Sequence, residues 1–141
     1  MRALVVSFFV FAFLGVGVEI IFTSIFGHLK KRSIGEIDWS LRGQSYLWMF
    51  PIYGCLAVFF PMVRDIASEW NILFRGIFYG VGVLIFEFGA GLLLERCTGV
   101  CPWKYTNGWH VRGYAKLDYL PLWMIFGLFV EWIYLNCLRT Q

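Results

Sequence analysis

Two cysteines near the middle of the chain have the residue type that could bind a metal or form a redox pair. Cys97 and Cys101 form a C-x-x-x-C pair, whereas zinc ribbons and thioredoxin-like sites use C-x-x-C. His28 and His110 could complete a ligand set only by folding back from separate loops. We therefore expect no metal and no cofactor.

Three glutamates offer a second kind of chemistry, because each lies within a long apolar stretch. Glu19, Glu87 and Glu131 are surrounded by aliphatic and aromatic residues. A carboxylate removed from water is costly unless it is hydrogen-bonded or paired. Each of these acids should therefore face other parts of the protein, or a ligand, rather than an apolar surrounding.

The composition indicates what that surrounding is. Hydrophobic residues make up 60% of the 141 residues and charged residues 15%, where soluble domains have roughly 45–50% and about 25%. A chain of this length has too little interior to hide so much apolar surface as a soluble monomer. The net charge of +3 gives no sign of a nucleic-acid partner. The excess apolar surface must face lipid or other subunits.

Four stretches are long enough to cross a bilayer, which requires about 20 mostly apolar residues per helix. They comprise residues 3–26, 46–63, 72–94 and 119–138, and none shows the alternation of a barrel strand. The first exceeds a typical signal-peptide core and contains Glu19, so we interpret it as a retained helix. The sequence predicts an all-α membrane protein with four transmembrane helices in one integral membrane domain, residues 1–141.

Lys and Arg in the connections predict the orientation. The two longer loops contain more of them than the opposite side, which favours longer loops in the cytoplasm and both termini outside, in the plasma membrane or a bacterial inner membrane. A disulfide between Cys97 and Cys101 would then face a reducing compartment. The loop residues are Lys30, Lys31, Arg32, Arg42, Arg96, Lys104, Arg112 and Lys116, and the opposite side has Arg2, Arg64, Arg75 and Arg139.

The chain resembles one helical hairpin written twice, with tandem halves at residues 1–65 and 72–139. LRGQSYLWMFPIYG in the first half corresponds to VRGYAKLDYLPLWMIFG in the second, and each half has one acid in a glycine-bearing helix, Glu19 or Glu87. The halves enter the membrane in the same sense, so they would be parallel repeats about an axis along the membrane normal. The alternative is chance recurrence of Trp, Gly and Leu.

Depth separates the three acids. At a rise of about 1.5 Å per residue, Glu19 and Glu87 share a layer roughly 7 Å from the midplane, on the side of the longer loops. Glu131 lies in the opposite half. We interpret Glu131 as a helix-packing residue and the matched pair as lining a polar cavity, although packing seams with hydrogen-bonded or protonated acids remain the alternative. Small residues on the same helix faces predict close packing: Gly15, Gly76, Gly80, Gly91 and Gly127.

Arg42 and Arg112, the arginines of the two Arg-Gly repeats, are the available countercharges for this pair. A loop folded back could place each guanidinium at a carboxylate, where arginine can form paired hydrogen bonds. Trp48 and Trp123 would border the site and Trp103 would cap it. The alternative makes the arginines headgroup anchors and the tryptophans an interfacial belt.

Two stretches resemble the transmembrane protein 229 family, which is related to bacterial proteins described as ABC-transporter type IV or CmpB-like. They are LWMFPIYG, with Gly43 upstream, and CPWKYT, followed by Gly113 and LDYLPLW. The resemblance covers nearly the whole chain and adds Tyr53 and Asp118 to the candidate ligand site. Lys104 departs from the pattern, which has an acid there. The resemblance implies a small multi-pass membrane protein. Its pattern also includes Glu19, Trp48, Pro51, Gly54, Glu87, Trp103, Tyr105, Tyr119 and Trp123.

No hydrolase, metalloprotease or nucleotide-binding motif is present in the sequence. The leading hypothesis is that the chain binds or moves a small polar or amphipathic molecule, including a lipid, at Glu19 and Glu87. The rival hypothesis is an accessory subunit of a larger membrane complex, with a partner helix or a second copy filling the polar seam. A membrane enzyme using the two carboxylates is the third reading, and it lacks a nucleophile or metal.

Overall fold

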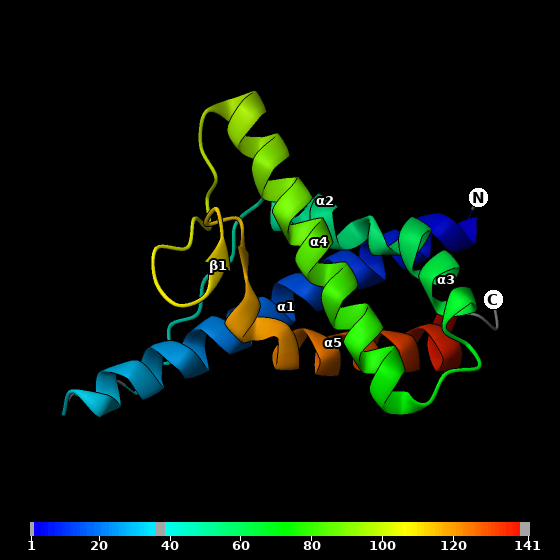
Figure 1. Ribbon diagram of the computed structural model, residues 1–141, viewed down its shortest axis with the longest axis horizontal. Coiled ribbons are helices and arrows are strands. Elements are labelled where there is room, and N and C mark those ends of the chain that lie inside the picture. Colours follow the sequence, from blue (N-terminus) through cyan, green and yellow to red (C-terminus); the bar gives the residue numbers. More distant parts are fainter. Residues whose placement is uncertain (1, 36–38, 139–141) are drawn as a thin grey trace. The chain divides into compact units, whose positions relative to one another are not determined.

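The computed structural model describes residues 2–35 and 39–138, which are mostly helical (Figure 1). Four helical segments are long and apolar enough to cross a membrane: Arg2–Ser33, Met49–Ile66, Ile72–Thr98 and Leu117–Leu138. The predicted all-α membrane fold with four transmembrane helices is therefore confirmed. Arg139, with the end of the second predicted repeat half, lies outside the described residues. The elements are α1 (Arg2–Ser33), α2 (Met49–Gly54), α3 (Leu56–Ile66), α4 (Ile72–Thr98), β1 (His110–Val111), β2 (Ala115–Lys116), η1 (Leu117–Tyr119), α5 (Leu120–Ile133) and η2 (Tyr134–Leu138).

The helices extend beyond the apolar stretches that predicted them. The helix α1 continues through a basic last turn to Ser33, where Lys and Arg suit the negative end of the helix dipole. The helix α4 continues to Thr98 and ends at Gly99, which has a φ of 79° and donates its N–H to the Glu95 carbonyl at 2.9 Å. This left-handed cap is the common glycine ending of a helix.

The chain divides into two compact units, Met1–Phe59 and Phe60–Gln141. In the first unit α1 packs against α2. Gly15 lies under the ring of Tyr53, so close that a Cβ there would be 2.1 Å from the Tyr53 Cγ. Gly54 lies in the same way against the ring of Phe8. The two helices approach through these glycines, as small residues allow in membrane proteins.

An extended stretch between α1 and α2 lies along α1. The Gln44 N–H donates to the Thr23 hydroxyl at 2.8 Å, and the Ser24 hydroxyl donates to the Leu41 carbonyl. Gly43 lies against the Ile20 carbonyl, where a Cβ would clash with the backbone. These contacts hold residues 41–45 against the last part of α1 and thereby place Ser45 near Glu19.

In the second unit α4 and α5 run side by side in opposite directions (Figure 1). Near the start of α4, Gly76 faces Leu128, and one turn later Gly80 faces Leu120 and Met124. Gly127 on α5 faces Tyr79 in return, and a Cβ at Gly127 would lie 2.4 Å from the Tyr79 Cβ. Glycines on both helices therefore bring the two backbones together.

The connection from α4 to α5 is an ordered loop rather than a loose linker. Its two short strands pair antiparallel, with His110 opposite Lys116 and Val111 opposite Ala115. The loop returns to α4 through Tyr114, whose side chain lies against Gly91. The loop therefore covers the last turns of α4, above the position of Glu87.

Candidate functional site

Glu19 is held by hydroxyl groups from the following segment of its own unit. The Ser45 hydroxyl donates to Glu19 Oε2 at 2.9 Å. The Tyr53 hydroxyl supplies a second hydrogen bond, and the Tyr53 ring is the one that packs on Gly15. The extended stretch and α2 thus each bring one neutral donor to this carboxylate.

Glu87 has a comparable arrangement in the second unit. Its side chain lies on α4 at only 8% exposure, and the Tyr105 hydroxyl donates to Glu87 Oε1 at 2.7 Å. The loop positions Tyr105 through a backbone hydrogen bond to the Gly113 carbonyl at 2.9 Å and through edge-on contact with the Tyr119 ring. Each of the two acids is therefore hydrogen-bonded by a hydroxyl from the segment that follows its helix.

The two arginines of the Arg-Gly sequences are both exposed. Arg42 is exposed, and its Nε donates to the Ser40 hydroxyl at 3.2 Å. Arg112 lies at the tip of the β1–β2 turn with a φ of 51°. The structure places the Ser45 hydroxyl at Glu19 and the Tyr105 hydroxyl at Glu87. The signal missed in the sequence was the hydroxyl-bearing residue in each following segment, Ser45 and Tyr105.

The remaining candidate residues have three different environments. Trp48 is half exposed, whereas Trp103 is buried and its indole N–H donates to the Tyr114 carbonyl within the loop at 3.1 Å. The indole nitrogen of Trp123 is buried and has no hydrogen-bond partner among the described residues. Asp118 accepts the Trp109 backbone N–H at 3.1 Å. Trp103 and Asp118 therefore organise the loop itself.

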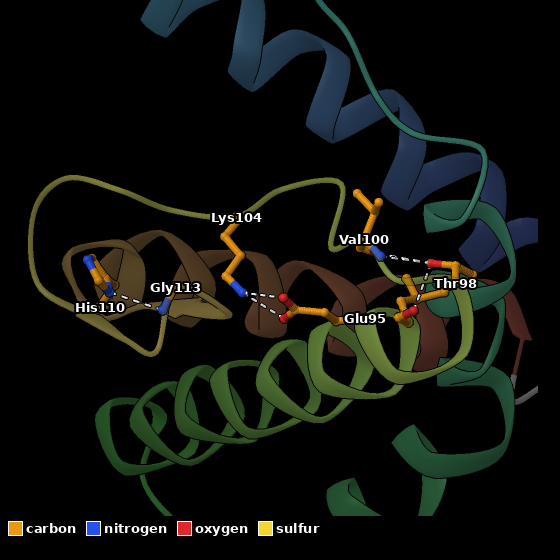
Figure 2. A network of polar contacts seen from close by, with 7 residues as sticks. Glu95, Thr98, Val100, Lys104, His110 and Gly113 are labelled. Atoms are coloured by element: carbon orange, nitrogen blue, oxygen red, sulfur yellow. Dashed lines mark hydrogen bonds and ion pairs between the residues drawn. The ribbon is translucent and has the colours of Figure 1, made fainter.

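Lys104 forms the tightest ion pair of the loop (Figure 2). Its ammonium group donates to both oxygens of Glu95 at 2.6 and 2.7 Å, and it lies 4.6 Å from the centre of the Tyr114 ring. The hydrogen bond to Glu95 raises the pKa of Lys104 above its ordinary value. Lys104 is therefore a cation of the loop that is matched by an acid on α4.

His110 and the cysteines do not converge on a metal. The Nδ1 of His110 accepts the Gly113 N–H at 3.1 Å (Figure 2). Among the described residues no group of three or more His, Cys, Asp or Glu side chains could hold a metal ion. Cys97 and Cys101 are both free thiols, the first exposed and the second buried.

The different burial of these thiols gives a direct test of the loop. Burial raises the pKa of the Cys101 thiol, and the thiolate is the reactive form. We expect iodoacetamide to modify a variant retaining only Cys97 at least about tenfold faster than one retaining only Cys101, measured by mass spectrometry in mild detergent. Unfolding in dodecyl sulfate should make the two rates similar. Equal rates in the folded protein would mean that the loop does not cover Cys101.

A buried charge cluster in the second unit was missed in the sequence. Glu131 on α5 is only 4% exposed. It accepts the Tyr79 hydroxyl at 3.0 Å, and the Nε atoms of Arg64 and Arg75 lie 3.9 and 3.4 Å from its two oxygens. The sequence analysis placed Glu131 in the half of the membrane away from the longer loops, and it placed Arg64 and Arg75 on that same side. Combining these two predictions could have revealed the cluster.

Four apolar helical spans with acids buried between them define a small multi-pass integral membrane protein. The chain belongs to the family described as "Putative ABC-transporter type IV", whose model matches residues 6–140. This family places the chain among transport-related membrane proteins. No solved structure matches it.

Proposed function

We propose that this protein binds, and in the membrane moves, a small polar or amphipathic molecule that its two acids Glu19 and Glu87 recognise. The observation that carries the proposal is the repeated pairing of a membrane-embedded acid with a hydroxyl from the following segment, Ser45 in one unit and Tyr105 in the other. Ionisable groups within membrane spans mark ligand and ion pathways more often than ordinary packing positions do.

The partners of Glu19 indicate the chemistry of the ligand. Ser45 and Tyr53 are neutral donors, so they orient the carboxylate without cancelling its charge. A ligand with an ammonium group or several hydroxyls could replace or bridge these donors, because hydrogen bonds to a charged group are the stronger kind. The half-exposed ring of Trp48 supplies an apolar surface for the rest of such a molecule.

The tandem hairpin is part of the same proposal. In each hairpin a glycine on the first helix receives side chains of the second helix, Gly15 under Tyr53 and Gly80 under Met124. On the second helix of each hairpin, a glycine lies against an aromatic ring from the first helix. This shared packing supports repeat halves at residues 1–65 and 72–139.

The proposed orientation keeps the longer loops in the cytoplasm. Arg64 and Arg75, two of the cations on the opposite side, lie against Glu131. Their charge is therefore partly compensated, which increases the excess of free positive charge on the side of the longer loops.

Native mass spectrometry of the detergent-purified protein tests the binding proposal. We expect a discrete bound mass in the wild type that is lost in Glu19→Gln/Glu87→Gln, because glutamine retains the shape of the side chain but not its charge. Glu69→Gln, an exposed change in the connection between α3 and α4, should retain the bound mass. The helical circular-dichroism spectrum must be the same in all three.

Two other outcomes would decide against ligand binding. A wild type and double variant that are both free of bound mass would contradict the proposal. A bound protein chain lost in the double variant would favour the rival function, an accessory subunit whose partner packs at the same acids.

A further inference from the structure

The cluster around Glu131 contains more positive than negative buried charge. Arg64 comes from α3, Arg75 from α4 and the single buried carboxylate from α5. The arginine side chains are 17% and 24% exposed. Asp65, 3.7 Å from Arg64 Nη1, is 76% exposed and therefore compensates weakly. Two guanidiniums thus share one buried acid.

One carboxylate does not satisfy both guanidiniums. The separations of 3.4 and 3.9 Å exceed the distance of about 2.7–2.9 Å at which an arginine donates to a carboxylate. Glu131 Oε1 instead accepts the Tyr79 hydroxyl. Both arginine Nε atoms are buried without a hydrogen-bond partner among the described residues. Because buried charges require pairing, the cluster is one anion short.

The position of the cluster indicates the source of that anion. Arg64 is two residues before the end of α3, and Arg75 is in the first turn of α4. Both therefore lie near the ends of membrane spans, at the depth of the lipid headgroups. The start of a long helix such as α4 also favours a negative charge.

An open, shallow apolar groove lies at the same end of α4. Its volume is about 360 Å³, and it is lined by Trp70, Asn71 and Phe74. Asn71 and Arg75 are four residues apart, so they share one face of the helix start. A molecule with an anionic head and an apolar body could place the head at the arginines and its body against the two aromatic rings.

We propose that Arg64 and Arg75 form a binding site for a phosphate group, carried by an anionic membrane lipid. Glu131 and Tyr79 hold the two arginines in position, and the phosphate oxygens accept from the guanidinium N–H groups that Glu131 leaves unused. Arginine suits this role because its planar fork can donate two parallel hydrogen bonds to a phosphate. The site is separate from Glu87, which lies three turns further along α4.

The test measures binding of phosphatidylglycerol to the purified full-length protein by native mass spectrometry, with phosphatidylcholine and inorganic phosphate in parallel. We expect the wild type to bind phosphatidylglycerol on the order of tenfold or more tightly than Arg64→Gln/Arg75→Gln does. Arg2→Gln/Arg96→Gln removes the same charge at two exposed arginines and should bind as the wild type does. Arg64→Lys/Arg75→Lys should bind with intermediate strength, since lysine retains the charge without the fork.

A second variant keeps the test informative if the double glutamine variant does not fold. Glu131→Gln leaves both guanidiniums without their shared carboxylate, so it should be less stable than the wild type in lipid-free detergent, and phosphatidylglycerol should raise its unfolding temperature by more than it raises that of the wild type. If inorganic phosphate raised the unfolding temperature as much as phosphatidylglycerol does, free phosphate would be the ligand and the lipid assignment would be overturned. The site itself would be overturned if Arg64→Gln/Arg75→Gln, Arg64→Lys/Arg75→Lys and Glu131→Gln all bound phosphatidylglycerol as the wild type does.

Discussion

Replacing Glu131 by glutamine is expected to destabilise the second unit more than any other single neutralisation in the chain. The change removes the one buried carboxylate between Arg64 and Arg75 and leaves two cations without their counterion. Removing one partner of a buried ion pair costs about 3–5 kcal/mol. Tyr79→Phe, which removes only the hydroxyl that bonds Glu131, should cost about 1.5–3 kcal/mol.

The measurement is reversible unfolding by increasing dodecyl sulfate in a neutral detergent free of anionic lipid, followed by circular dichroism. Glu95→Gln is the matched control, because its ion pair with Lys104 lies at the surface of the loop and surface pairs contribute little. A loss of stability no larger for Glu131→Gln than for Glu95→Gln would show that the cluster does not hold α3, α4 and α5 together.

The second large effect is expected at the contact between α1 and α2. Gly15→Ala introduces a methyl group that would lie 2.1 to 2.5 Å from the ring carbons of Tyr53. That ring also carries the hydroxyl that bonds Glu19, so it cannot move without disturbing the carboxylate. Overpacking of this kind costs about 1–3 kcal/mol, and we expect Gly15→Ala to weaken both stability and the proposed ligand binding.

Gly17→Ala is the control in the same helix. A Cβ at Gly17 meets nothing within 4 Å, and alanine favours a helix over glycine by roughly 0.5–1 kcal/mol. The two substitutions should therefore change the unfolding midpoint in opposite directions. Similar midpoints for Gly15→Ala and Gly17→Ala would exclude close packing of Tyr53 on Gly15.

The number of membrane-spanning helices could be predicted because its cause is local. A bilayer requires a certain length of apolar chain, and the four stretches are visible without tertiary information. The end of α4 was predictable for the same reason, since Gly99 adopts the left-handed conformation that closes a helix. The rise per residue also predicts a depth for Glu19, Glu87 and Glu131, and that depth stays a prediction.

The break in the second span was not predicted. Residues 46–63 were expected to form one helix, whereas α2 ends at Gly54 and α3 begins at Leu56. Gly54 lies against Phe8, a contact between residues far apart in the sequence. Pro61 within α3 removes a further backbone donor.

The sequence by itself determined the class of this protein and its four spans, because hydropathy acts along the chain. Only the tertiary structure decided which group meets each acid. The paths of the loops bring Ser45 to Glu19 and Tyr105 to Glu87, and the packing of α3, α4 and α5 brings Arg64 and Arg75 to Glu131. Charge alone favoured the arginines of the Arg-Gly sequences, but a hydrogen bond requires a donor within about 3 Å. Backbone path and helix packing set that distance.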